Sequence, residues 1–171
     1  MRARYLGPNW DTVHCRGVPF NTGDGLRMAL DIGAMPHGSW TTCHASPQDF
    51  ELPPFKLPST IGSGGEHQSR YMFTFSIMVN NKGQRFVDEA DDLRSLTYAK
   101  MGRAIIAQPG GVAYQIMDAK VRRTGLFPPS YEKASRGKAN TLEKLAEIFG
   151  IDPKGLVETC LLYTSPSPRD A

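Results

Sequence analysis

Several features that mark particular classes of protein are scarce or missing in this sequence of 171 residues. The three cysteines show no CxxC or Cys/His ligand spacing, so neither a disulfide framework nor a zinc or other metal site is indicated. No apolar run approaches the roughly 18 residues of a membrane-spanning helix, and the first residues lack the apolar core of a signal peptide. The formal charge is only +3 and the basic residues form no block, which gives nucleic-acid binding little support. We therefore expect a protein of a reducing, cytoplasmic environment.

The rest of the composition is that of an ordinary globular domain, with 40% hydrophobic and 22% charged residues. Strand-like apolar runs occur at 77–79, 85–87 and 112–117, whereas 90–108 and 141–150 show the spacing of amphipathic helices. These strands and helices do not alternate regularly. The pattern therefore predicts the α+β class.

The most informative stretch is VNNKGQRFVDEADDLR, residues 79–94. An apolar run, an Asn- and Gly-containing turn and a second β-prone run predict a hairpin here. Four carboxylates between Asp88 and Asp92 suit the positive end of the helix that follows, and Arg94 falls near its first turn. Arg94 can flank the buried face and reach a cleft. The alternative is a surface ion pair with Asp91 or Glu89, which would contribute little.

Two further segments contain candidate ligand-binding residues. In 21–34, Gly23 and Gly25 flank Asp24 at the start of a helix that Gly33 can end, and the exposed backbone donors of such a start suit a polar ligand. The alternative is that Asp24 caps its own helix. Residues 35–69 are rich in Pro, Gly and Ser and predict loops around one or two short strands, with His44 among them. A solvated or capping histidine is the alternative there.

The C-terminal part predicts two helices and a foreign tail. Asn140 or Thr141 caps a helix that ends at Gly150, and Asp152 precedes Pro153 in the order typical of a new helix. The string CLLYTSPSPRD at 160–170 reads like a translated sequencing adapter, so we set 160–171 apart from the fold. On this interpretation the natural protein continues beyond residue 159. A natural Ser/Pro tail is the alternative.

Five segments in order carry a family resemblance: NTGDGLRMALDIGA, TTCHA, IMVNNKGQRFVDE with a following arginine, GGVAYQIMD and TLEKLAEIFGIDPKGLVET. Together they resemble the flavoprotein family of fumarate reductase and succinate dehydrogenase, and most of all its tricarballylate-oxidising members. The likeness runs from about residue 2 to residue 159. It implies an FAD-dependent oxidoreductase that acts on a small polycarboxylate and passes electrons to an acceptor.

The resemblance also implies roles for individual residues. Residues 1–37 would be a returning segment of an incomplete FAD-binding domain, with Asp24 in contact with the cofactor. Residues 38–159 would be the capping domain that closes over the substrate. His44 would bind a substrate carboxylate, and Arg94, after a one-residue insertion, would exchange a proton with the substrate carbon.

These roles make chemical sense. Dehydrogenation next to a carboxylate removes a weakly acidic proton together with a hydride, and since no side chain accepts a hydride, a flavin is needed. Arg94 and His44 would supply two cationic clamps for a polycarboxylate. A guanidinium is an unusual base, but neighbouring cations in a water-poor cleft disfavour its charged form. Glu89, Asp91 and Asp92 are candidates to relay the proton.

The sequence departs from the family in two respects. Gln68 and Ser69 stand where the family has a threonine and a glutamate, with His67 and Ser69 as candidate substitutes. The glycine-rich dinucleotide fingerprint GxGxxG is absent, as are the later histidine and arginine that complete the family's substrate site, so we expect the chain as written to bind FAD weakly or not at all and to be inactive. A fumarate reductase or succinate dehydrogenase-like flavoprotein is one alternative. A non-catalytic binding module that retains only the cap is another.

Overall fold

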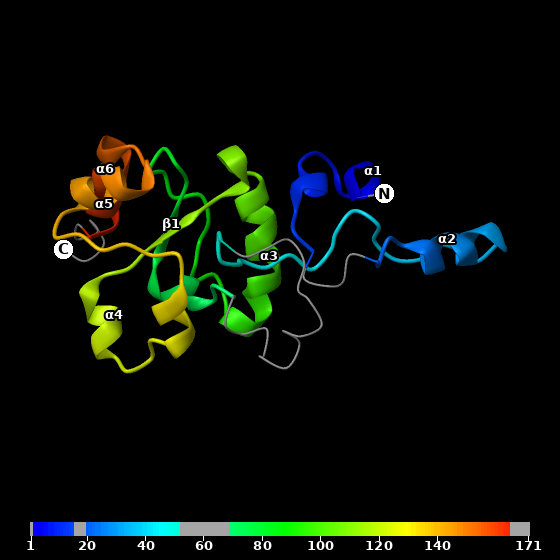
Figure 1. Cartoon of the computed structure of the whole chain (residues 1–171), viewed down its shortest axis with the longest axis horizontal. Helices are drawn as coiled ribbons and strands as arrows, with labels where there is room; N and C mark the ends of the chain where they lie inside the picture. Colours follow the sequence, from blue (N-terminus) through cyan, green and yellow to red (C-terminus); the bar gives the residue numbers. More distant parts are fainter. Residues whose placement is uncertain (1, 16–19, 52–68, 165–171) are drawn as a thin grey trace.

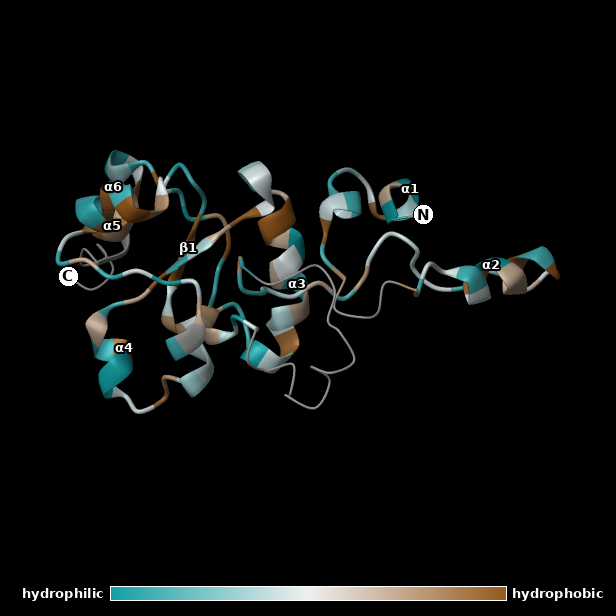
Figure 2. Cartoon of the chain, in the orientation of Figure 1, coloured by the Kyte–Doolittle hydropathy of each residue, from teal (hydrophilic) through white to brown (hydrophobic). Residues whose placement is uncertain are grey.

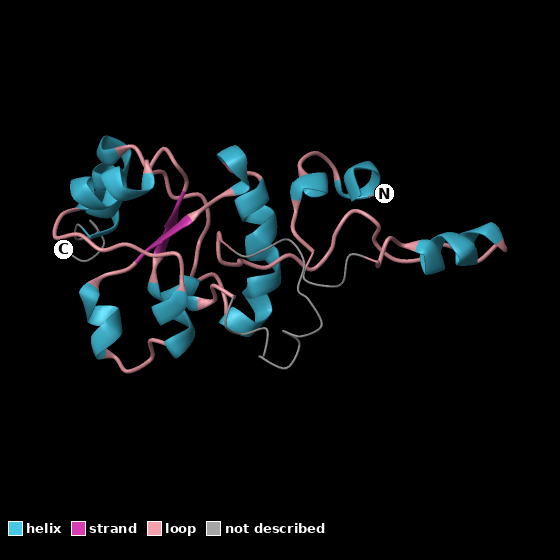
Figure 3. Ribbon diagram, viewed as in Figure 1, coloured by secondary structure: helices cyan, strands magenta, loops and turns pink. Residues whose placement is uncertain are grey.

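The computed structural model describes residues 2–15, 20–51 and 69–164 (Figure 1). The α-helices in these ranges are α1 (Arg2–Leu6), α2 (Asp24–Asp31), α3 (Arg94–Ile106), α4 (Ala119–Arg123), α5 (Leu142–Phe149) and α6 (Pro153–Thr164). The strands are β1 (Ile77–Val79) and β2 (Tyr114–Ile116), and the short 3-10 helices are η1 (Trp10–Thr12), η4 (Met72–Phe75), η5 (Pro109–Gly111) and η6 (Pro129–Lys133). This mixture of helices with one small sheet agrees with the predicted α+β class (Figure 3).

The sheet lies between two groups of helices. Strands β1 and β2 pair antiparallel, with Met78 opposite Gln115. Because side chains alternate along a strand, Met78 points to the opposite face from Ile77 and Val79. Met78 packs on Met101 of α3, whereas Val79 packs on Leu156 of α6, so β1 separates α3 from α5 and α6 (Figure 1).

Two hydrophobic clusters fill the spaces on either side of the sheet. Figure 2 shows brown, hydrophobic segments in the strands and in the helices beside them. The cluster toward α5 and α6 is built on the buried residues Val79, Ala146, Ile151, Leu156 and Cys160. The cluster toward α3 is built on Phe73, Met78 and Met101. Cys160 lies within the α6 helix, which continues to residue 164; the proposed tail boundary at residue 160 stays a prediction.

The turn after β1 forms as predicted, but the second arm of the hairpin does not. The Asn80 side chain accepts hydrogen bonds from the backbone N–H groups of Lys82 (2.9 Å) and Gln84 (3.1 Å), which closes the turn. The predicted strand at 85–87 is reduced to a single bridge between Val79 and Arg85. The ladder partner of β1 is instead β2, a strand that the sequence also predicts.

Helix α3 begins four residues later than predicted, at Arg94. The carboxylates before it bind other groups. Asp88 accepts a hydrogen bond from the Ala90 N–H (3.0 Å) and Asp92 from the Leu93 N–H (2.6 Å), and such local bonds compete with helix formation. None of the acidic residues therefore lies in the first turn of α3.

The caps of the C-terminal helices are confirmed. The Thr141 side chain accepts from the Lys144 N–H (3.3 Å) at the start of α5, and Gly150 ends that helix with a φ of 65°. Asp152 accepts from the Lys154 N–H (3.1 Å) at the start of α6. Both bonds satisfy backbone donors that a helix start leaves unpaired.

The backbone at the start of α6 is in direct contact with the backbone of the turn after β1. The Asp152 N–H donates to the Asn81 carbonyl (2.9 Å), and the Thr159 hydroxyl donates to the Gly83 carbonyl (2.6 Å). A Cβ on Gly155 would lie 2.0 Å from the carbonyl oxygen of Lys82. Only glycine allows this approach, so Gly155 fixes how α6 meets the sheet.

Replacing Gly155 by alanine should destabilise the fold. The added methyl group meets backbone that cannot rotate away, and overpacking of this kind costs about 1–3 kcal/mol. The free energy of unfolding from urea titration measures the effect. Gly25→Ala is the matched control, since a Cβ there meets nothing within 4 Å and should change stability by about 1 kcal/mol or less. Equal effects of the two variants would contradict the close contact.

Helix α2 lies away from the rest of the described chain (Figure 1). It ends as predicted, with Gly33 at a φ of 86° and the Ala34 N–H donating to the Ala29 carbonyl (3.0 Å). None of its residues is buried, and the nearby Ile32 and Met35 are 87% and 80% exposed. The predicted short strands in the loop region do not form within 35–51; the rest of that region lies outside the described residues.

Candidate functional site

His44 is an exposed residue whose ring and following backbone both contact helix α3. Its ring meets the ring of Tyr98 edge to face, with centroids 4.9 Å apart and planes at 71°. The Ala45 N–H donates to the Ala99 carbonyl (3.2 Å), and the Gly102 N–H donates to the Ala45 carbonyl (3.1 Å). His44 is therefore held against α3 by main-chain bonds as well as by its own ring.

Arg94 is the first residue of α3, and its side chain is exposed. The surface ion pair that the sequence allows does not form. Glu89 binds Arg85 (2.5 Å), and Asp91 pairs with Lys100. Among the described residues no carboxylate lies within ion-pair distance of Arg94, so its guanidinium is available for an anion.

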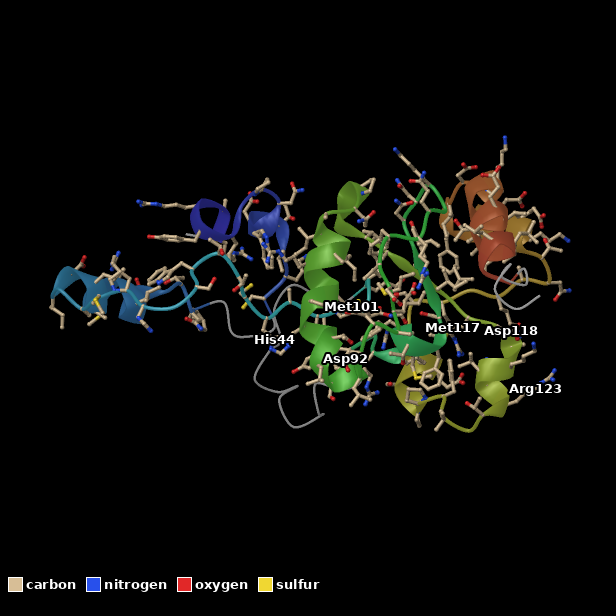
Figure 4. The ribbon with its side chains drawn as sticks, turned by 180° about the vertical axis from the view of Figure 1, so that it is seen from behind. His44, Asp92, Met101, Met117, Asp118 and Arg123 are labelled. Carbon is tan, nitrogen blue, oxygen red and sulfur yellow. The ribbon has the colours of Figure 1, made fainter. Side chains whose placement is uncertain are left out.

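The structure brings Arg94 and His44 to the same end of α3. Tyr98, which contacts His44, lies four residues after Arg94, and residues at this spacing share one side of a helix. Helical side chains also lean toward the helix N-terminus, so the Tyr98 ring lies over the turn that begins with Arg94. Figure 4 shows His44 beside the end of α3 where Asp92 is labelled. The ring of Tyr71 also contacts the ring of Tyr98, with centroids 5.2 Å apart.

A buried ion pair fastens the chain that follows His44. The Asp49 carboxylate accepts from the Arg70 Nε (2.9 Å) and Nη2 (2.7 Å), and from the Ser135 N–H (2.9 Å) and hydroxyl (2.5 Å). Burial acts to raise the pKa of Asp49, but the hydrogen bonds from Ser135 and Arg70 outweigh it and hold the pKa below its ordinary value. One carboxylate thus joins three segments that are far apart in the sequence.

Tyr131 is joined to this ion pair through Arg70. Its hydroxyl accepts from the Met72 N–H (2.8 Å) and donates to the Gln115 side chain (3.0 Å), while the guanidinium of Arg70 lies 4.9 Å from its ring centroid. Burial raises the pKa of Tyr131 to about 12, although the Met72 hydrogen bond and the charges of Arg70 and Arg94 act to lower it. Arg94 is therefore within electrostatic range of this network.

Asp49, Arg70 and Tyr131 are residues that the sequence analysis missed. Each depends on a partner at least 16 positions away, and neither periodicity nor a motif marks such a pairing. Of the proposed substitutes for the family's threonine and glutamate, Ser69 is buried, and His67 lies outside the described residues, as does Gln68. Among the proposed proton relays, Glu89 is committed to Arg85 and to the Met78 N–H (2.5 Å).

Asp24 is not brought to this site. It lies at the start of α2, where its carboxylate accepts from the Thr22 hydroxyl (2.5 Å) and pairs with Arg27 (3.3 Å). It does not cap its own helix, because the N-cap residue is Gly23 and no side chain caps this end. The first N–H groups of α2 therefore remain available, and a Cβ on Gly25 would meet only open space.

The start of α2 fits one edge of a cofactor site, because free backbone donors and open space are what a polar cofactor group needs. No other described element covers this edge, so the described residues do not enclose a flavin. No group of three metal-ligating side chains occurs among them. In the same ranges no helix is long and apolar enough to cross a membrane.

Comparisons with known proteins point to one class of enzyme. Over 91 residues, 53% of this chain, it is 38% identical to "Fumarate reductase (cytochrome)" from Shewanella frigidimarina, with the same identity to the protein of strain NCIMB 400. The crystal structure of 3-ketosteroid delta1-dehydrogenase from Sterolibacterium denitrificans, in complex with 1,4-androstadiene-3,17-dione, matches 94% of this chain with a TM-score of 0.62 and 27% identity. Both matched proteins are oxidoreductases by name, and this chain is similar to a part of each.

The likeness is to part of each flavoprotein. The chain spans 15% and 14% of the two fumarate reductases and 29% of the steroid dehydrogenase. No protein-family model matches it.

Replacing Tyr131 by phenylalanine should destabilise the network under the site. At neutral pH the loss of the hydroxyl leaves the buried Met72 N–H and Gln115 oxygen unpaired, at a cost of about 1–3 kcal/mol in the free energy of unfolding. The pKa of the Tyr131 hydroxyl is about 12 in the folded chain and about 10 in the unfolded chain. The protonated hydroxyl therefore stabilises the fold fully below pH 10, and this stabilisation is lost as the pH rises toward about 12. The difference between wild type and Tyr131→Phe should shrink over that range.

The measurement is urea unfolding at a series of pH values, with Tyr5→Phe as the control. Tyr5 lies on the N-terminal segment, where its ring contacts Trp40. A difference between wild type and Tyr131→Phe that stays constant from neutral pH to pH 12 would contradict the buried, hydrogen-bonded hydroxyl.

Proposed function

We propose that this chain is the substrate-covering part of an FAD-dependent oxidoreductase that dehydrogenates a tricarboxylate such as tricarballylate. Residues 38–159 form its capping domain, and 1–37 belong to its FAD-binding domain. The observation that carries the proposal is that His44 contacts Tyr98, one turn from Arg94 on α3, with the guanidinium of Arg94 making no ion pair in the described part of the chain. Two such groups suit a ligand with several carboxylates.

Each residue has a defined task in this reaction. His44 binds one carboxylate and orients the substrate, while Arg94 accepts the proton that leaves the carbon beside a carboxylate. FAD, when bound in the complete enzyme, supplies the acceptor for the hydride from the neighbouring carbon, so that a C=C bond forms. Asp24 contacts the cofactor at the start of α2. The electrons then pass to an external acceptor.

One structural feature supports Arg94 in the proton transfer. Arg94 begins a rigid helix, so its backbone position is well defined, and rigid placement is what acid–base catalysis requires.

The reverse reaction is the second candidate. It is favoured by the relatives named fumarate reductase, which are 38% identical over 53% of the chain. In that direction Arg94 would donate the proton and the product would be the saturated acid. Comparing flavin reduction by tricarballylate with oxidation of reduced flavin by fumarate, both in the complete enzyme, distinguishes the two directions.

Replacing Arg94 by lysine in the complete enzyme should abolish most of the activity. Lysine keeps the positive charge, so KM should change little, but it lacks the planar guanidinium that accepts the proton. We expect kcat to fall by about 10²–10⁴-fold, the usual contribution of acid–base catalysis. Anaerobic flavin reduction by tricarballylate measures it. Turnover close to wild type would show that Arg94 is not the proton-transfer group.

The chain as written should purify without flavin and show no turnover. The start of α2 offers one edge of a cofactor site and no described element encloses it. Absorbance spectra of the purified protein, before and after incubation with FAD, measure cofactor retention. Yellow protein that keeps FAD through gel filtration would contradict this expectation.

A further inference from the structure

Gly102 lies inside α3 at the point where the segment after His44 crosses the helix. An ideal Cβ on Gly102 would lie 2.5 Å from the carbonyl carbon of Ala45, 2.6 Å from its oxygen and 2.7 Å from the nitrogen of Ser46. Real Cβ atoms do not approach other atoms so closely, and all three contacts are with backbone. The helix and the crossing segment can therefore touch only because residue 102 has no side chain.

The cost of this glycine indicates that the contact is needed. Glycine inside a helix is about 0.5–1 kcal/mol less favourable than alanine. In return, the Gly102 N–H donates to the Ala45 carbonyl (3.1 Å), and the Ala45 N–H donates to Ala99 one turn earlier (3.2 Å). Two main-chain bonds thus fix the residue that follows His44, and they set how far the imidazole lies from α3.

We propose that Gly102 is a positioning residue for carboxylate binding, because it seats the His44 segment on α3 and so holds the His44 ring on Tyr98, one turn from Arg94. The inference rests on the proposed function, in which both cationic groups bind one polycarboxylate. Gly102 does not touch the ligand. It acts through the backbone of Ala45, and it determines whether His44 and Arg94 can reach the same molecule.

An added methyl group would displace the segment without releasing it. The Arg70 N–H still donates to the Pro47 carbonyl (3.0 Å), and Asp49 still binds Arg70, so the chain remains attached beyond the crossing. The displaced residues are those that precede Pro47 and Asp49, and they include His44. The expected defect is therefore local, because His44 leaves the Tyr98 ring while α3 and the core remain.

The test compares wild type with Gly102→Ala in this chain, by NMR. The ring current of Tyr98 shifts the His44 imidazole protons, so their resonances report the contact directly. In Gly102→Ala they should move toward the values of an unstructured histidine. The affinity for tricarballylate, titrated in the same samples, should fall about 10- to 100-fold, the effect of a small misplacement of a binding group. Ser95→Ala, on the exposed side of α3, should leave both readouts unchanged.

Each outcome decides the proposal. The proposal is overturned if Gly102→Ala folds, keeps the His44 shifts and binds tricarballylate as wild type does. If wild type does not bind tricarballylate while the His44 shifts still move, the seating by Gly102 stands and the proposed function fails. If Gly102→Ala does not fold, Tyr98→Leu replaces it. Because leucine has no ring current, only the affinity is compared in that variant: a loss of affinity supports the proposal, and unchanged affinity overturns it.

Discussion

The carboxylate of Asp49 is the interaction on which the arrangement of the site depends. A buried charge is costly unless it is paired and hydrogen-bonded, and Asp49 satisfies this condition by binding Arg70 and Ser135 at once. Removing Arg70 would leave the Asp49 carboxylate without the cation that it pairs with. The segment after His44, the segment before β1 and the chain after η6 are therefore linked to one another.

The small sheet organises the remaining elements. With only three residues in each strand, β1 and β2 would be marginal alone. They persist because their two faces bury different clusters, one against α3 and the other against α5 and α6. One consequence is that α3 is held from its core side, while its first three residues, which begin with Arg94, are exposed. Helix α2 has no such support in the described chain, and its apolar residues are exposed.

The parts of the fold that could be predicted are those governed by neighbours in sequence. Thr141, Gly150 and Asp152 act on backbone groups within a few residues, so their capping roles follow from local chemistry. The start of α3 was predicted wrongly because Asp88 and Asp92 bind nearby N–H groups outside the helix, an outcome that the charge pattern alone does not distinguish from a helix start.

For the site, sequence order indicated His44 and Arg94 as candidates but could not show that Tyr98 and Gly102 bring them to one end of α3. That depends on contacts between segments more than 50 residues apart. The same limit explains why Asp49 and Arg70 were missed. The role of Asp24 stays a prediction, and the structure adds only that it lies on a separate, exposed helix.

The central claim is that His44 and Arg94 act together on one polycarboxylate. The most direct measurement is a double-mutant cycle in which wild type, His44→Gln, Arg94→Gln and the double variant are titrated with tricarballylate by calorimetry. Groups that bind the same ligand at neighbouring positions should show a coupling energy of at least about 0.5 kcal/mol. Losses that add to within about 0.3 kcal/mol, or single variants that bind as wild type does, would contradict the claim.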